Sequence, residues 1–308
     1  MKKSTSVRLL FFCGITALVV ASFVVQKYWL GVTKKTTTVN EVQTEEQVVK
    51  SELPNLMPIP PDKVYPEKMV RPKTQAEVEE IYHGINMVQI PRVFIEELPP
   101  DWQIRNNEDK TLFMKIITAL ILRTNEKIKA EKKRLIRLQE KFLWQMAWTP
   151  EEEAFFNMLV QKYDVFTKKK REGQLQELIE KVDIIPPSIA VVQAIWYTDW
   201  GQKNQKSIYG EYGWIKEEAY QPLEFESLAD ATDSFALQIN SRSQLHQFHQ
   251  IRRQYMFFAH RKSIGLDIID MMAQFMDWDK QYVEKVGRTY GKGFILELDL
   301  AKFKNEDE

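Results

Sequence analysis

The chain has 308 residues, of which 44% are hydrophobic and 28% charged, so it can bury a sizeable core and is neither wholly disordered nor a small disulfide-built protein. Its 43 Lys and Arg residues balance 43 Asp and Glu residues, and a net charge of zero argues against a dedicated nucleic-acid-binding protein. The single cysteine, Cys13, excludes an internal disulfide and a thiolate metal site, and no glycine-rich nucleotide-binding run is present.

Residues 1–30 predict a signal-anchor, which is a transmembrane helix that stays on the mature protein. The basic residues of Met1–Arg8 precede seventeen uncharged, mostly apolar residues, Leu9–Val25. Counted as far as Leu30, the segment would form about 33 Å of helix, enough to span a bilayer. The basic flank favours a cytoplasmic N-terminus, with the remaining chain outside the cytoplasm. The alternative is a cleaved signal peptide, for which Val20–Ser22 is a weak cleavage site.

Residues 31–74 predict a Pro/Thr-rich linker. Thr36–Thr38 is a threonine tract, and six of the thirteen prolines fall between Pro54 and Pro72. A polar segment of this kind buries too little apolar surface to offset the entropy lost on ordering. Its root-mean-square reach is about 35–40 Å, so we expect it to space a domain away from the membrane, or alternatively to serve as a Pro-rich ligand for a partner.

Residues 75–308 are expected to form one mostly α domain with its core at about 100–305. Its first part, Gln75–Pro100, is transitional. It contains a short helical pattern around Val78–Ile85 and an extended piece at Met87–Phe94.

From Asp109 the apolar residues recur at helical spacing, and the pattern continues through a charged stretch to Lys141, which predicts one helix of over thirty residues. The next helix has a clear start. Thr149 is placed to cap it, Pro150 suits its first position, and Glu152 completes a capping box.

The rest of the domain also has helical patterns, and only Ser207–Trp214 is expected to be a loop or hairpin. Further helices are expected at Leu175–Val182, Ser188–Trp200, Ser227–Ile239, Ser243–Arg253, Ile264–Phe275 and Lys280–Tyr290.

A set of sequence blocks is more specific than these patterns. Val182–Ala194 reads VDIIPPSIAVVQA, and Trp200-Gly201 follows it after five residues. The other blocks are Asn125–Leu135, Ser207–Gly210, the group Asn240, Phe248 and Arg252, and Gly265–Val283. In order and spacing the blocks resemble the bacterial Bax-like proteins of the peptidoglycan glucosaminidase superfamily, where the first run is approximately R-V-D-x-I-P-x-S-L-A-L-A-Q-A-A-x-E-S-G-W-G. The resemblance covers roughly residues 98–302.

The resemblance implies a lysozyme-like, mostly α glucosaminidase domain. Together with the predicted anchor, it leads us to expect this domain in the bacterial periplasm, held at the inner membrane by a single span. It implies a carboxylic acid at the end of one helix, beside a sugar-binding cleft. The family's reaction is cleavage of the N-acetylglucosaminyl bond in peptidoglycan. That chemistry needs an acid to protonate the leaving oxygen and a group that stabilises an oxocarbenium-like transition state.

This sequence departs from the family pattern at the catalytic positions. Counted back from Trp200-Gly201, the family's glutamate falls on Tyr197, and the tyrosine of its Y-S-x-R-G run falls on Phe275. The asparagine of its N-L-F-G block becomes Ser207. A phenol, with an ordinary pKa of about 10, is a poor general acid for this bond. Asp199 and Glu211 are the carboxylates that could replace the lost acid.

Aromatic residues gather around these blocks. Flat rings suit the faces of sugars, so Tyr209 and Trp214, together with Ser207, are the candidate substrate-binding residues. We expect Trp196 and Trp200 to belong to the core, because aromatic side chains dominate burial in helical domains.

His246 and His249 lie three residues apart, a spacing that a metal could use. No carboxylate at helical spacing joins them, and the sequence holds neither an HExxH nor a GxSxG motif. We therefore expect no metal site, no cofactor and no nucleic-acid partner.

The sequence thus predicts a membrane-anchored glucosaminidase-fold domain that has lost its catalytic acid and binds peptidoglycan glycan strands as a cell-wall-associated scaffold. One alternative is an active endo-β-N-acetylglucosaminidase that uses a relocated carboxylate. Another is a protein-binding structural subunit of an envelope-spanning complex.

Overall fold

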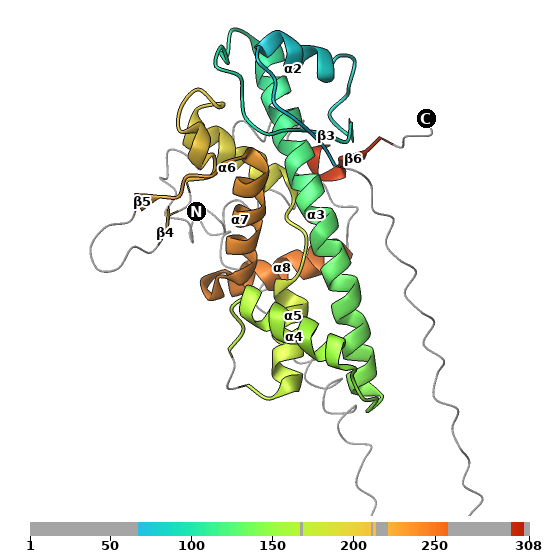
Figure 1. Ribbon diagram of the computed structural model, residues 1–308. Coiled ribbons are helices and arrows are strands. Elements are labelled where there is room, and N and C mark those ends of the chain that lie inside the picture. The colour runs from blue at the N-terminus through green and yellow to red at the C-terminus, as the bar shows by residue number, and fades with distance from the viewer. Residues whose placement is uncertain (1–66, 167–168, 211, 214–220, 258–296, 305–308) are drawn as a thin grey trace, which may run out of the picture. The chain divides into compact units, whose positions relative to one another are not determined.

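The computed structural model describes residues 67–166, 169–210, 212–213, 221–257 and 297–304 (Figure 1). All of them belong to one compact unit, Pro61–Glu308. Helices, including three short 3-10 turns, account for 61% of the described residues, so the predicted mostly α class is confirmed. Within these ranges no helix is both long and apolar enough to cross a membrane. The predicted anchor lies outside them, as do the helices expected at 264–275 and 280–290.

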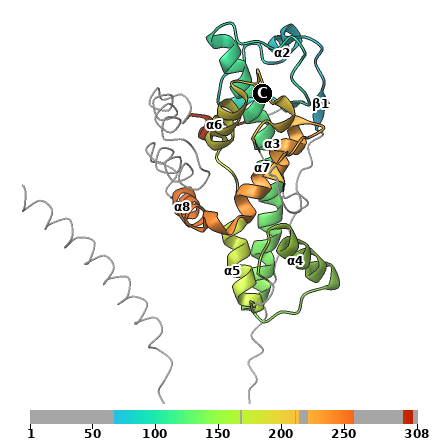
Figure 2. The same ribbon diagram turned by 90° about the vertical axis from the view of Figure 1, so that its left-hand side faces the viewer.

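The domain is built around the long helix α3 (Asn107–Leu143), which has 37 residues, as the sequence predicts (Figures 1 and 2). Asn106 and Asp109 form a capping box at its start. The first half of α3 is apolar on most sides and is buried by α6 (Pro187–Thr198) and α7 (Leu228–Ser241). Its second half is charged, and there the buried residues lie one or two turns apart; they are Ile128, Leu135 and Leu138.

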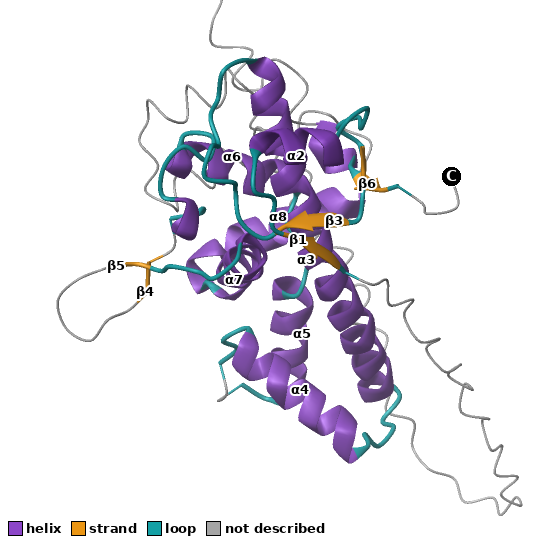
Figure 3. Cartoon of the chain, turned by 45° about the horizontal axis from the view of Figure 1, so that its top comes forward, coloured by secondary structure: helices purple, strands orange, loops and turns teal. Residues whose placement is uncertain are grey.

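The part of the chain before α3 is held by two short parallel strand pairs. Strand β1 (Lys68–Val70) pairs with β3 (Val93–Ile95), and β2 (Gln89–Ile90) pairs with β6 (Lys302–Phe303) near the end of the chain (Figure 3). The predicted linker therefore does not extend to residue 74, because β1 already belongs to the folded unit.

The remaining helix of this region, α2, occupies Gln75–Ile81 and begins a few residues before the helical pattern that the sequence places at Val78–Ile85. The side chain of Thr74 caps it by accepting a hydrogen bond from the Glu77 amide.

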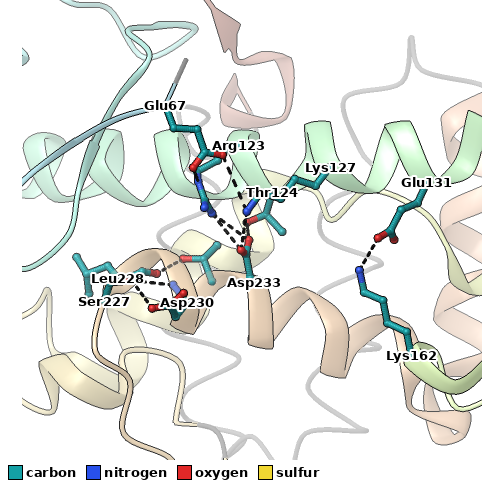
Figure 4. Close-up of polar contacts among 11 residues, drawn as sticks. Glu67, Arg123, Thr124, Lys127, Glu131, Lys162, Ser227, Leu228, Asp230 and Asp233 are labelled. Atoms are coloured by element: carbon teal, nitrogen blue, oxygen red, sulfur yellow. Dashed lines mark hydrogen bonds and ion pairs between the residues drawn. The ribbon is translucent and has the colours of Figure 1, made fainter. Parts of the chain in front are cut away.

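A group of ion pairs fixes the start of the folded chain on α3 and α7 (Figure 4). Arg123 is 10% exposed, and its Nε donates to Glu67 at 2.7 Å while its Nη1 lies 3.1 Å from Asp233 Oδ2. Thr124 and Lys127 also donate to Asp233. Burial alone would raise the pKa of Asp233, but these hydrogen bonds and the charge of Arg123 hold it below its usual range.

Helices α4 (Pro150–Lys162) and α5 (Arg171–Lys181) pack together beside the second half of α3 (Figures 1 and 3). The predicted start of α4 is confirmed, because Thr149 and Glu152 form the expected capping box and Pro150 is the first helical residue.

The last part of the chain confirms the remaining helices that lie within the described residues. Ser227 caps α7, and the segment after it begins as a 3-10 turn (η2, Ser243–Leu245) before it becomes α8 (His246–Phe257). The loop or hairpin predicted at Ser207–Trp214 begins where a 3-10 turn (η1, Gln205–Ser207) ends. It contains strand β4 (Tyr212–Gly213), which pairs antiparallel with β5 (Gln221–Pro222). A final 3-10 turn, η3, occupies Leu298–Leu300.

Candidate functional site

Three of the sequence blocks, those at Asn125–Leu135, at Val182–Ala194 and at Asn240 with Arg252, meet around the segment that leads into α6. The side-chain amide of Asn125 on α3 exchanges two hydrogen bonds, of 2.7 and 2.8 Å, with the backbone of Ile185. Asn240 on α7 donates to the Asp183 carbonyl at 2.8 Å, and Arg252 on α8 donates to Asn240 at 2.6 Å. Three distant helices therefore hold the turn before α6 through buried polar side chains, and this fixes where α6 starts.

Arg252 is the largest wholly buried side chain of this group, with 1% exposure. Its guanidinium donates to the backbone carbonyls of Glu180 and Lys181, and burial lowers the pKa of Arg252 to about 10. The group therefore keeps its charge at neutral pH. His249, one turn earlier on α8, is 1% exposed and lies 2.9 Å from the Ile239 carbonyl through Nε2. Burial and, after it, the charge of Arg252 lower the pKa of His249 to about 4, so this ring is neutral at neutral pH.

The first turn of α6 is capped from the far end of the chain. The backbone amide and the hydroxyl of Ser188 donate to the two carboxylate oxygens of Asp299 at 2.9 and 2.8 Å. A carboxylate at a helix N-terminus satisfies free amide groups and complements the helix dipole. The sequence gives no local signal for this contact, because 111 residues separate its partners.

The other end of α6 has an uncommon backbone. Asp199, Trp200 and Gly201 follow the helix with φ of 50°, 65° and 79°, all in the left-handed region that non-glycine residues seldom adopt. Thr198 holds this turn, since its hydroxyl donates to the Ala194 carbonyl and accepts from the Gly201 amide. Strained backbone of this kind is a common feature of functional sites.

Gly201 is required for packing as well as for its φ. A Cβ at this position would come within 3.0 Å of the side chains of Leu98, Phe113 and Trp102. The indole of Trp102 also donates to the Trp200 carbonyl at 2.9 Å. The turn after α6 is therefore pressed against the core and cannot shift easily.

Tyr197 lies in the last turn of α6 and is partly exposed. Its ring lies against the backbone of Gly210, where an added Cβ would overlap the ring atoms. Gly210 has φ of 65°, so both its conformation and this contact require glycine. Tyr197 and the end of the Ser207–Gly210 block are thus in direct contact.

The aromatic side chains are arranged differently from the expectation. Tyr209 is 2% exposed, stacks on Phe235 with ring centroids 4.3 Å apart, and bonds to the Thr232 hydroxyl, so it belongs to the core and does not line a cleft. Trp196 is 37% exposed, so the prediction that it is a core residue is wrong. Trp200 is partly buried and packs against the core.

Ser207, a candidate substrate-binding residue, is 5% exposed and is the last residue of η1. Among the described residues neither its hydroxyl nor Gln193 Oε1 has a hydrogen-bond partner. Gln193 donates through Nε2 to the Tyr209 carbonyl, so both groups lie where α6 meets the turn at 205–210. Buried polar groups usually bond to water or a ligand when protein partners are missing.

Asp199 is exposed and forms the C-cap of α6, directly beyond the end of the helix. Glu211, Trp214 and Phe275 lie outside the described residues. Across the described ranges no three His, Cys, Asp or Glu residues gather as a metal site would require.

No family model matches this chain, and no curated protein or solved structure matches it either.

Proposed function

We propose that this protein is a catalytically degenerate glucosaminidase-fold domain that binds peptidoglycan glycan strands at the end of α6. In this proposal the fold is lysozyme-like, residues 1–30 anchor the chain in the bacterial inner membrane, and the domain lies in the periplasm as a cell-wall-associated scaffold.

The observation that carries the proposal is the identity and position of Tyr197. It stands where the family pattern has its catalytic glutamate, and its ring occupies the space beside Gly210. A phenol cannot match a carboxylic acid in protonating a glycosidic oxygen near neutral pH. Loss of a general acid typically lowers the rate by about 10²- to 10⁴-fold.

Backbone geometry after α6 supports the underlying resemblance. Asp199 falls on the family's glycine in E-S-G, and its φ of 50° is one that glycine adopts freely and Asp tolerates. Gly201 falls on the last glycine of the same run, at a position where a side chain would overlap the core. Asn125, Asn240 and Arg252 give two further blocks a shared structural role around Val182–Ile185.

Side chains around the end of α6 suit a sugar ligand. The rings of Trp196 and Tyr197 lie 6.3 Å apart and both are at least partly exposed. Exposed polar residues, Asp199 and Asn204, lie directly beyond the helix. Apolar ring faces next to hydrogen-bonding groups match the faces and hydroxyls of a pyranose.

One observation is compatible with the alternative that Asp199 acts as the catalytic acid. In a continuing helix Asp199 would point about 200° away from Tyr197. Because α6 ends at Thr198, helical geometry does not impose this separation on Asp199. Its carboxylate is nevertheless exposed to water, whereas a catalytic acid of this kind is usually held protonated by an apolar wall. We therefore favour binding over hydrolysis.

Retention on purified sacculi tests the binding surface. Trp196→Ser should weaken retention of the full chain in mild detergent by about tenfold, a change of about 1.4 kcal/mol in binding free energy. Trp144→Ser is the matched control, because Trp144 is also exposed, at 58%, but lies at the end of α3. Equal retention of wild type and Trp196→Ser would reject this surface as the glycan site.

A gain of function tests the lost acid. Tyr197→Glu together with Phe275→Tyr should raise the release of reducing ends from sacculi above the wild-type level, with Tyr197→Gln and Phe275→Tyr as the uncharged control. Release that is equal in both double variants would show that position 197 is not the acid position.

A further inference from the structure

The connection between α3 and α4 presents apolar side chains to solvent. This α3–α4 tip, Leu143–Trp148, has the sequence LWQMAW. Leu143 is 70% exposed and Trp144 58% exposed, whereas Trp148 turns inward onto Phe156. Single exposed apolar residues are ordinary on protein surfaces, but adjacent large ones at a helix end are typical of an interaction site.

The α3–α4 tip is rigid rather than loosely extended. Gln145 has φ of 55°, its amide donates to the Phe142 carbonyl, and the Met146 amide donates to the Lys141 carbonyl. These bonds close the end of α3 in a Schellman motif, and the capping box at Thr149 starts α4 directly afterwards. The backbone therefore holds Leu143 outward and gives it little freedom to fold back onto the domain.

Charges next to the α3–α4 tip are mostly paired. Lys141 lies 2.6 Å from Glu152, and Arg171 lies 2.7 Å from Glu153. Glu151 is exposed in the first turn of α4. Arg171 also lies over the Trp148 ring, 4.5 Å from its centroid, and the exposed Lys169 and Lys170 precede it, so basic residues border the apolar tip on the α5 side.

The chain before the domain limits what the tip can reach. Glu67 binds Arg123, and 21 residues of helix, about 32 Å, separate Arg123 from Trp144. The linker that the sequence predicts has 36 residues from Gly31 to Pro66, a length for which the expected root-mean-square reach is about 30–36 Å. If Leu9–Leu30 spans a bilayer, the tether can hold the domain at the height at which the tip touches that bilayer.

We propose that the α3–α4 tip inserts Leu143 and Trp144 into the interface of the bilayer that holds the N-terminal anchor. Tryptophan favours the headgroup level, where its ring meets acyl chains and its N–H meets water. The contact would set the orientation of the domain above the membrane. It rests on the predicted anchor and not on glycan binding.

Lipid quenching at a labelled tip residue tests this docking. The full chain with Cys13→Ser carries one cysteine-linked NBD fluorophore, either at the exposed tip position as Ala147→Cys or at the exposed control position Gln103→Cys, before the start of α3. The protein is reconstituted in phosphatidylcholine vesicles with doxyl-labelled lipid. The label at 147 should be quenched at least about fivefold more than the label at 103.

Two further arms make the test decisive. Leu143→Ser with Trp144→Ser should remove the quenching at 147 while the chain stays on the vesicles, both in phosphatidylcholine alone and in vesicles that also contain phosphatidylglycerol. Absence of quenching at 147 in vesicle-bound chain overturns the proposal. A rise in NBD fluorescence at 147 that depends on the density of protein in the vesicles, without quenching by doxyl-labelled lipid, overturns the proposal in favour of contact with a second copy of the chain. A chain that does not bind vesicles overturns both the anchor and the docking.

Discussion

The stability that His249 contributes to the domain should be lost as the pH falls below about 6.5. His249 is 1% exposed, and its pKa is lowered to about 4 by burial and by the neighbouring charge of Arg252. In the unfolded chain the same ring has a pKa of about 6.5. Below pH 6.5 the unfolded state therefore binds a proton that the folded state does not bind until about pH 4.

The size of the effect follows from these two values. A histidine whose pKa is lower in the folded than in the unfolded state stabilises the fold at pH values above its unfolded pKa. This stabilisation is lost as the pH falls towards the folded pKa. Between pH 7 and pH 5 the folded and unfolded titrations of His249 predict a loss of about 2 kcal/mol in the contribution of this residue to the free energy of unfolding. Further loss follows as the pH falls towards about 4, where folded His249 begins to bind a proton.

Urea unfolding of the full chain in mild detergent, followed by tryptophan fluorescence at both pH values, measures this loss. His249→Gln keeps a donor for the Ile239 carbonyl and has no charge to gain, so its stability should change about 2 kcal/mol less than that of wild type. His246→Gln is the matched control because His246 is exposed, and it should behave as wild type. Equal pH dependence in wild type and His249→Gln would refute the reasoning.

Three further substitutions, one of them with a control on α5, test the framework around α6, each by the free energy of unfolding. Gly201→Ala should cost about 3 kcal/mol, because its Cβ would overlap core side chains and its φ is left-handed. The control, Gly173→Ala on α5, should stabilise the domain by about 0.5–1 kcal/mol, and equal effects of the two changes would contradict the packing at Gly201. Asn125→Ala should cost about 2–4 kcal/mol, because the backbone amide and carbonyl of Ile185 lose their buried partner; a neutral effect would show that water replaces it. Asp299→Ala should cost about 1 kcal/mol, because the backbone amide and the hydroxyl of Ser188 lose their acceptors at the start of α6; no change would show that water replaces the carboxylate.

Local signals explain what could be predicted about the fold. The capping box at Thr149 depends on residues three apart, so it could be recognised without knowing the fold. The length of α3 also follows from helical spacing that continues through its charged half. By contrast, β1 forms only because Val93–Ile95 lies beside it, and nothing within Lys68–Val70 distinguishes this strand from a linker.

The candidate site shows where sequence reasoning stops. Helix α6 is apolar on every side, and Ile189 to Ala194 are all buried, so periodicity cannot indicate which of its residues faces solvent. Trp196 is exposed because the helix ends two residues later, and Tyr209 is buried because Phe235 of α7 covers its ring. The left-handed turn at Asp199 also has no signal of its own, because the glycine that would mark it is absent.

The proposal that the end of α6 binds glycan without cleaving it is tested most directly by one incubation of wild-type protein with purified sacculi. Bound protein and released reducing ends are measured in the same sample. We predict that the protein is retained on the sacculi and that the release of reducing ends stays at the level of the buffer control. Release that is abolished by Asp199→Asn or Glu211→Gln would contradict the account and would assign the catalytic acid to that carboxylate.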